Sequence, residues 1–355
     1  MWTKSKKNKG SFGRILIVNY AMDTNHPIFS HQYDVSLALS KYYKHTTVLT
    51  NQKGNASVTH NLDLKVIPWN SKNRLLSIFN FSLFFLIELL IKRPSIVFYH
   101  MTEVQCAFTS PITKFLGIKS YLWYAHASDS NFLNFSMYFI EGLITSTKGS
   151  CPRTGDKVHY IGQGIDSKIF KFKFHSFNKP LKLCHVGRID PSKNIEKIID
   201  LSNEITNFGY QNSIYLVGAP SNDSTKESYI ESLKFHAAEK NVQLIFLGNK
   251  PRIQLSDFLH QMDFFTHAYT GSLDKTLIEA TMCGLPVLTL NMEYHEIFPD
   301  IDENINRNLF YQFLKFNNLD QDQLFKLLQS RYLRVQNHHS LDHWIVQLIE
   351  IFKEN

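Results

Sequence analysis

The segment spanning residues 269–289 constrains the fold of this chain most. It reads YTGSLDKTLIEATMCGLPVLT: a loop of small residues, a stretch with helical periodicity and a short buried-strand pattern. Leu277, Ile278 and Met282 recur at helical spacing, whereas Gly284 and the proline two residues later end a helix. The sequence therefore predicts a loop, a helix and a buried strand in direct succession.

A loop of small residues that leads into a helix N-terminus is a ready site for an anion. The unpaired N–H groups and the positive end of the helix dipole both point outward there. Glu279 lies roughly one turn further into the predicted helix, where its carboxylate can accept hydrogen bonds from sugar hydroxyls. We therefore expect a ligand that carries both phosphate and sugar, such as a nucleotide sugar.

This segment resembles the donor-site signature of the family 4 retaining glycosyltransferases, which belong to glycosyl transferases group 1 and have the GT-B fold. A second segment, residues 183–195 (LCHVGRIDPSKNI), is similar to the strand–Gly–Arg…Lys element of that family. The two segments have the family's order and separation. The resemblance is clear over residues 158–289 and looser before them. It implies a hexosyltransferase built from two Rossmann-like, doubly wound parallel-sheet domains that face a cleft.

Short apolar runs alternate with helical patterns along the chain, which favours parallel, doubly wound sheets of an α/β fold. The 355 residues are enough for two domains, and a second alternation starts with the runs at 158–161 and 182–186. We expect four parts: a basic flexible tail over residues 1–13, an N-terminal acceptor-side Rossmann-like domain over 14–165, a C-terminal donor-binding Rossmann-like domain over 175–335, and a helix over 340–355. The resemblance implies that this last helix crosses back to the N-terminal domain.

Three residues are expected to carry the chemistry. The resemblance assigns Arg188 and Lys193 to the positions that contact the donor diphosphate, beside Gly187, and fixed cations there stabilise the departing phosphate. Arginine can hold a phosphate through two parallel N–H bonds, and lysine acts as a point charge. His126, after the strand predicted at 121–125, matches the family's histidine near the anomeric centre. The alternatives are two solvated loop cations and a hydrogen-bonded loop histidine.

The donor loop departs from the family pattern at one position. Glu279 matches the second glutamate of the family's Glu-x7-Glu motif, which binds the ribose, but Gly271 stands where the first is expected. The loop can compensate through Asp274, whose alternative role is to cap the helix, or through backbone N–H groups. Loss of activity is the other outcome. The expected donor-binding residues are Gly187, Lys250, Gly271, Ser272, Leu273, Asp274, Lys275, Thr276 and Glu279.

The resemblance implies metal-independent transfer, without a cofactor beyond the nucleotide-diphosphate sugar. The expected acceptor is a glycan, a lipid-linked molecule or a small molecule in cell-envelope polysaccharide or glycoconjugate synthesis, while base and sugar stay open. Within the same fold, the alternatives are a nucleotide-sugar epimerase and a sugar-phosphate synthase. From another class, the alternative is a non-catalytic basic protein that binds membranes or nucleic acid. Gly271 favours that alternative, whereas Arg188, Lys193 and Glu279 together favour an enzyme.

Most of the net charge of +7 lies at the N-terminus, because residues 1–22 hold four lysines, one arginine and no acidic residue. Each such cation contributes about 1 kcal/mol at an anionic membrane surface, so the tail can hold the chain there. A solvated terminus is the alternative, and no nucleic-acid partner is expected. The four cysteines are scattered and form no C-x-x-C pair, as in cytoplasmic proteins with reduced thiols. We expect a cytoplasmic protein, peripheral on the inner face of the membrane.

The apolar run at residues 75–91 can be mistaken for a membrane span. It lies at the short limit for crossing a bilayer and contains Asn80 and Glu88. A turn and the buried-strand pattern at 96–100 follow it, as in an α/β domain. We expect a packed helix of that domain, and a peripheral helix that dips into the membrane is the alternative.

Overall fold

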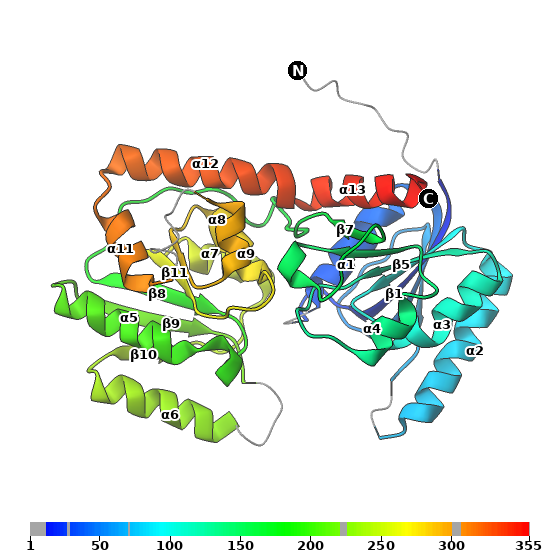
Figure 1. Cartoon of the computed structure of the whole chain (residues 1–355), viewed down its shortest axis with the longest axis horizontal. Coiled ribbons are helices and arrows are strands. Elements are labelled where there is room, and N and C mark those ends of the chain that lie inside the picture. Colours follow the sequence, from blue (N-terminus) through cyan, green and yellow to red (C-terminus); the bar gives the residue numbers. More distant parts are fainter. Residues whose placement is uncertain (1–11, 27–28, 70–71, 221–225, 300–306, 355) are drawn as a thin grey trace. The chain divides into compact units, whose positions relative to one another are not determined.

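The structure, a computed structural model, describes residues 12–26, 29–69, 72–220, 226–299 and 307–354. It divides into two compact units: the first comprises Met1–Gly164 and Leu341–Asn355, and the second comprises Ile165–Ser340. Each unit has one parallel sheet with helices on it, which confirms the predicted α/β fold class (Figure 1).

The sheet of the first unit has seven strands in the order β3-β2-β1-β4-β5-β6-β7, and every neighbouring pair is parallel. The strand order therefore reverses between β1 and β4, as in a doubly wound fold. The last strand corrects one expectation, because the run at 158–161 forms part of this sheet and does not start the second. The strands are β1 (Phe12–Met22), β2 (Tyr43–Lys53), β3 (Leu62–Val66), β4 (Ile96–His100), β5 (Lys119–Trp123), β6 (Gly142–Thr145) and β7 (Val158–Tyr160).

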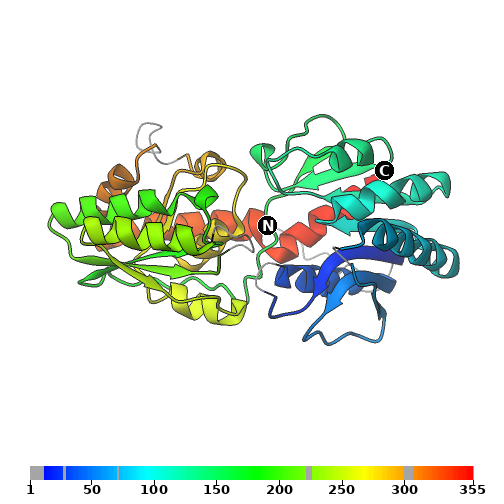
Figure 2. The same cartoon turned by 90° about the horizontal axis from the view of Figure 1, so that it is seen from below.

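Helices cover both faces of this sheet, because β1 is apolar at consecutive positions. Ile15 and Ile17 pack in one buried cluster with α1 and α13, while Leu16 and Val18 pack in the opposite cluster with α2 and α3. Figures 1 and 2 show the helices on the two sides. The helices of this unit are α1 (Ser30–Ser40), α2 (Arg74–Lys92), α3 (Glu103–Phe115), α4 (Asn131–Ser136) and α13 (Leu341–Glu354).

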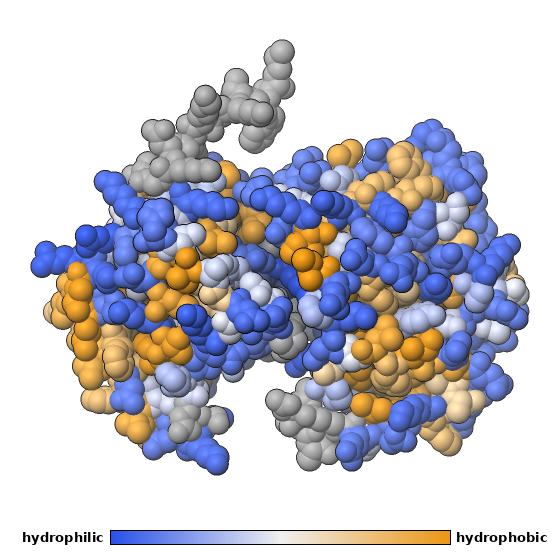
Figure 3. Space-filling view, turned by 180° about the vertical axis from the view of Figure 1, so that it is seen from behind, coloured by the Kyte–Doolittle hydropathy of each residue, from blue (hydrophilic) through white to orange (hydrophobic). Residues whose placement is uncertain are grey.

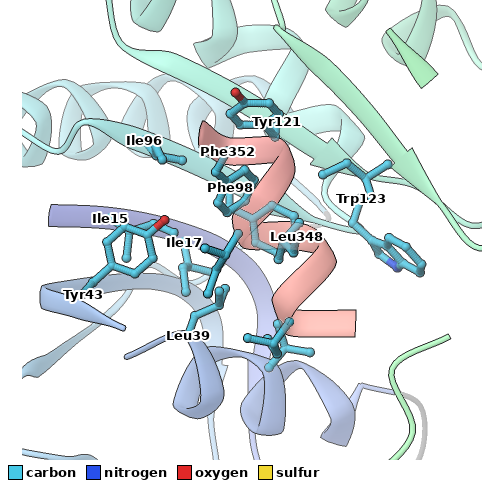
Figure 4. Close-up of a cluster of buried hydrophobic side chains, with 14 of the residues drawn as sticks. Ile15, Ile17, Leu39, Tyr43, Ile96, Phe98, Tyr121, Trp123, Leu348 and Phe352 are labelled. Atoms are coloured by element: carbon cyan, nitrogen blue, oxygen red, sulfur yellow. The ribbon is translucent and has the colours of Figure 1, made fainter. Parts of the chain in front are cut away.

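The last helix, α13, belongs to the core of the first unit. The Phe352 ring lies 4.7 Å from Tyr121 of β5 and 5.7 Å from Phe98 of β4, measured between ring centroids. Leu348, one turn earlier, is buried in the same cluster (Figure 4). The C-terminal segment is therefore a structural part of the unit that contains the N-terminal strands.

α3 and β6 are among the elements of the first unit that were not predicted. α3 contains Pro111 and several polar residues, so its helical pattern is weak. β6 is only four residues long, although all four are buried. Both elements are defined by their neighbours in space, which a single sequence pattern does not record.

The sheet of the second unit has five parallel strands in the order β10-β9-β8-β11-β12. Here the order reverses between β8 and β11. The strands are β8 (Leu181–Val186), β9 (Asn212–Val217), β10 (Gln243–Phe246), β11 (Phe264–His267) and β12 (Val287–Thr289). The helices are α5 (Ile195–Asn207), α6 (Lys226–Glu239), α7 (Arg252–Leu259), α8 (Lys275–Cys283), α9 (Met292–Ile297), α11 (Leu309–Asn317) and α12 (Gln321–His339).

Adjacent residues of the second sheet also enter opposite buried clusters. Phe264 of β11 packs on the side of α5, whereas Phe265 packs on the side of α8. α8 ends at Gly284, whose φ of 86° is the left-handed conformation expected of a glycine after a helix. The predicted loop–helix–strand order of residues 269–289 is thus present.

Candidate functional site

The site of the second unit lies where the strand order reverses. In open parallel α/β sheets, ligands bind outside the carboxyl ends of the strands at such a reversal point. The loop after β8 carries Arg188 and Lys193, and the loop after β11 carries Tyr269 and Asp274. Because β8 and β11 are hydrogen-bonded neighbours, the two loops meet there.

Lys193 is held in the interior of this site. Its Nζ lies 2.5 Å from Oδ2 of Asp274 and 4.1 Å from the centroid of the Tyr269 ring. Only 7% of the side chain is exposed, so the solvated-cation alternative is wrong for Lys193. The next residue fixes the loop, because Asn194 has left-handed backbone geometry and its side chain donates to the carbonyl oxygen of Ala268.

Arg188 differs from Lys193 in its surroundings. More than half of its side chain, 55%, is exposed, and Nε lies 3.6 Å from Oδ2 of Asp190. The Asp190 carboxylate also accepts a hydrogen bond from the backbone N–H of Ser192. This bond stabilises the short turn before Lys193. Arg188 therefore follows β8 as a half-solvated cation that a ligand can reach, and its diphosphate role stays a prediction.

Asp274 joins the two loops through its carboxylate. Burial opposes its ionisation, but the hydrogen bond from His267 and the charge of Lys193 outweigh burial and hold the Asp274 pKa well below its ordinary value. Nε2 of His267 lies 2.8 Å from Oδ2. The residue occupies the N-cap position of α8, but its side chain makes no capping hydrogen bond. The alternative that the carboxylate caps the helix is therefore wrong, since it binds Lys193 and His267 instead.

Two buried histidines lie beneath Asp274. The His185 and His267 rings are 5.9 Å apart, and both side chains are fully buried. Nδ1 of His185 lies 3.0 Å from the carbonyl oxygen of Thr266, so this nitrogen carries the proton and donates it. Burial and the neighbouring His267 lower the His185 pKa to about 3, which keeps the ring neutral.

Tyr269 explains how the loop accommodates Gly271. A Cβ atom added at Gly271 would overlap the hydroxyl group of Tyr269. The tyrosine therefore occupies space that a glutamate at position 271 needs. At the position where a glutamate is expected, the space beside Gly271 is thus filled by the tyrosine hydroxyl.

Asn291 fixes the shape of this loop from below. Its Nδ2 approaches the carbonyl oxygens of Tyr269, Gly271 and Ser272 at 3.3, 3.0 and 3.1 Å. Asn291 is fully buried. In the sequence it follows β12, the edge strand beside β11. The loop is therefore anchored through its backbone, which leaves its side chains to serve the site.

Glu279 lies on α8, buried from solvent, one turn beyond the loop. Its Oε1 is 3.3 Å from Nη2 of Arg252, the first residue of α7. The Arg252 guanidinium also lies 5.4 Å from the Phe170 ring centroid. The carboxylate is therefore charge-paired within the protein, and its ribose role stays a prediction.

The remaining predicted residues fall into three places. Ser272 and Leu273 are buried in the loop, and Lys275 and Thr276 begin α8. Lys250 lies in the loop before α7, with Nζ 5.8 Å from the Phe258 ring centroid. His126 follows β5 in the first unit, where its exposed ring makes an edge contact with Tyr124 at 5.6 Å. Gly187 directly follows β8. Its backbone lies close to Gly218, since a Cβ atom added at Gly218 would overlap the Gly187 carbonyl oxygen.

Comparison with known proteins assigns the family of this part of the chain. Residues 166–300 match the family model described as glycosyl transferases group 1. The match includes Arg188, Lys193, Asp274 and Glu279. The chain is a glycosyltransferase. A sequence search of curated proteins gives no match.

Solved structures show the fold of this glycosyltransferase to be GT-B. HepE from Anabaena in complex with UDP has 13% identity and a TM-score of 0.74, covering 97% of this chain and 100% of that one. Sucrose-phosphate synthase from Thermosynechococcus elongatus has 13% identity and a TM-score of 0.73, with 96% and 98% covered. A glycosyltransferase from Rickettsia africae has 14% identity and a TM-score of 0.73, with 97% and 98% covered.

Four residues of the site were not assigned by the sequence analysis: His267, Tyr269, Asn291 and Arg252. His267 is the last residue of the strand predicted at 264–267. The sequence pattern therefore already indicated its position at the carboxyl end of the sheet. Tyr269 and Asn291 follow strands in the same way. The pairing of Arg252 with Glu279 joins two helices, and no spacing in the sequence records it.

Proposed function

We propose that this glycosyltransferase is a retaining, metal-independent hexosyltransferase. In this proposal it moves a hexose-type sugar from a nucleotide-diphosphate donor to a glycan, lipid-linked or small-molecule acceptor. The observation that carries the proposal is the buried Lys193–Asp274 pair at the reversal point of the second sheet. A buried cation there can bind the diphosphate, and a carboxylate beside it can accept hydrogen bonds from hydroxyl groups of the sugar.

The contacts of Asp274 support this division of labour. Both Lys193 and His267 contact Oδ2, and Oδ1 carries no hydrogen bond from the described residues. In this proposal a sugar hydroxyl donates to Oδ1, while the diphosphate shares Lys193 with the carboxylate. In this proposal Arg188, which is half exposed shortly after β8, contacts the same phosphates.

The solved relatives support a nucleotide-sugar donor. HepE is crystallised with UDP, with UDP and glucose, and with UDP-glucose. The lipopolysaccharide outer core galactosyltransferase WaaB, with 12% identity and a TM-score of 0.64, supports an acceptor of cell-envelope synthesis. In this proposal, catalysis takes place in the cytoplasm or at the inner face of the membrane.

A donor panel followed by product analysis tests the proposal. The purified chain is titrated with UDP, GDP and ADP in thermal shift, because a ligand at a hundred times its Kd stabilises a protein by about 2.7 kcal/mol. The matching sugar nucleotides are then incubated with and without candidate acceptors in the presence of a chelator. A glycoside with the anomeric configuration of the donor supports the proposal. An epimerised sugar nucleotide, a sugar phosphate product or inversion at the anomeric carbon contradicts it.

A further inference from the structure

α2 is apolar on two opposite sides. One side packs against the sheet through Phe81, Phe85 and Leu89. A surface helix usually presents polar residues on its other side. Here the outward side instead exposes eight large apolar residues: Leu75, Leu76, Phe79, Leu83, Phe84, Ile87, Leu90 and Ile91, which we call the α2 face.

The α2 face is well exposed. Leu75 is 82% exposed and Phe79 is 64% exposed, and the neighbouring α3 adds Phe115 at 90%. α2 and α3 lie side by side in both ribbon views (Figures 1 and 2). The α2 face is the strip of hydrophobic surface at the lower left edge of the molecule in Figure 3. Contiguous exposed apolar surface of this kind marks an interaction site on soluble proteins.

Most charges at the two ends of the α2 face are positive. Lys72 and Arg74 lie at the start of α2, and Lys92 and Arg93 lie at its end, where Nζ of Lys92 is paired with Oδ2 of Asp63 at 2.7 Å. The one carboxylate of the helix, Glu88, is buried on the packed side, with Oε1 4.0 Å from Nζ of Lys65. The outward side therefore combines an apolar centre with cationic ends, which complements a surface that is apolar inside and anionic outside.

The start of β1 lies beside one of these ends. The Arg14 guanidinium of β1 donates to the carbonyl oxygen of Lys92 at 2.7 Å. Lys4, Lys6, Lys7 and Lys9 precede this strand in the sequence, with Lys9 three residues before Phe12. The described start of β1, which these lysines precede in the sequence, therefore lies next to the C-terminal end of α2.

We propose that the α2 face binds an anionic lipid surface, with the apolar side chains in the acyl boundary and the cations at the headgroups. By length and composition α2 alone, among the described helices, can cross a membrane, with a mean hydropathy of 1.9. Its packed side holds Glu88 and three core residues, so the helix lies along the surface and does not cross. This inference concerns the first unit and goes beyond the proposed donor chemistry.

Vesicle sedimentation tests this proposal with the full chain. Wild type is mixed with phosphatidylcholine vesicles with and without phosphatidylglycerol, and the variant Phe79→Gln with Phe84→Gln is compared. Burial of one large apolar side chain changes the partition coefficient between water and vesicle by about tenfold. The double variant should therefore bind vesicles at least tenfold more weakly than wild type. Both side chains are exposed and glutamine is a good helix former, so the fold should persist.

A matched control uses equally exposed apolar residues of the second unit. Phe235→Gln with Leu333→Gln should leave vesicle binding unchanged, because these side chains lie on α6 and α12. The variant Arg74→Gln with Arg93→Gln should still bind vesicles. Its preference for vesicles that contain phosphatidylglycerol should be several-fold smaller than that of wild type. UDP binding, measured in parallel, should not change in any variant, so failure of this surface and failure of the proposed donor site are distinguishable.

Three results would overturn the proposal. The first is wild-type vesicle binding by the Phe79 and Phe84 double variant. The second is equal binding to vesicles with and without phosphatidylglycerol. The third is a wild-type protein that does not bind vesicles but forms a dimer, while the Phe79 and Phe84 double variant is a monomer. In that case a second copy of the chain covers the α2 face.

Discussion

Lys193 and Asp274 lie 81 residues apart in the sequence, and their charged groups meet at 2.5 Å. They come from loops that follow neighbouring strands of one sheet, and His267 contacts the same carboxylate oxygen. A ligand anion that enters this site therefore meets a cation whose charge is already partly balanced. This relationship makes distinct predictions for the two partners.

Lys193→Ala should reduce kcat strongly, while Arg188→Ala should reduce it with less effect on stability. A lost electrostatic contact to a developing phosphate charge costs about 2.7–4 kcal/mol in comparable sites, or a factor of 10²–10³ in rate. Lys193→Ala also leaves Asp274 without its cation, whereas Arg188 is half exposed. Steady-state kinetics and thermal unfolding of both variants are the measurements. Wild-type turnover in a folded Lys193→Ala protein would remove the diphosphate role.

Asp274→Asn should separate the sugar from the diphosphate. The substitution removes the charge that balances Lys193, so the bare nucleotide diphosphate should bind as well as in wild type or more tightly. The sugar nucleotide should bind more weakly, since a hydrogen bond to a charged acceptor contributes about 1.5–3 kcal/mol. The substitution should not change the affinities through helix capping, because the carboxylate makes no capping hydrogen bond. Calorimetric titration with both ligands checks this, and equal losses for both would contradict it.

Glu279→Gln should lower both donor affinity and stability. The buried carboxylate lies 3.3 Å from Arg252, and removing one charge of a buried pair leaves the other uncompensated, at a cost of several kcal/mol. A ribose contact adds a loss of affinity for the sugar nucleotide and for the bare diphosphate alike. A double-mutant cycle with Arg252→Gln, read by denaturant unfolding, isolates the pair. If only stability changes and both ligands bind normally, Glu279 is structural.

The stability of the chain should fall as the pH drops below about 6.5. The His185 pKa is lowered to about 3 in the folded state by burial and by His267, from an ordinary value of 6.5. Between these values the unfolded chain binds a proton that the folded chain does not, so acid favours unfolding by up to about 1.4 kcal/mol per pH unit. His185→Gln can still donate to Thr266 but does not titrate. Its free energy of unfolding should therefore depend less on pH over this window, and an unchanged slope would exclude His185 as the source.

The sequence identified the layers of the fold because their signals are local. Consecutive apolar residues in β1 predict a strand buried on both faces, and Gly284 predicts the end of α8. The loops after β8 and β11, which the sequence analysis grouped together, do meet in the structure through Lys193 and Asp274. Among the elements that were missed, α3 and β6 have weak local patterns and depend on their neighbours in space.

By itself, the sequence determined the class of fold, many of its strands and helices in their chain order, and the two loops of the candidate site. The tertiary structure decided which charges meet. It paired Asp274 with Lys193 and His267 and not with the helix end, placed Arg252 against Glu279, and filled the space beside Gly271 with Tyr269. It also left the apolar side of α2 outward. The reason is physical: strand and helix periodicity act over a few residues, whereas ion pairs and burial depend on the residues that strand order brings together.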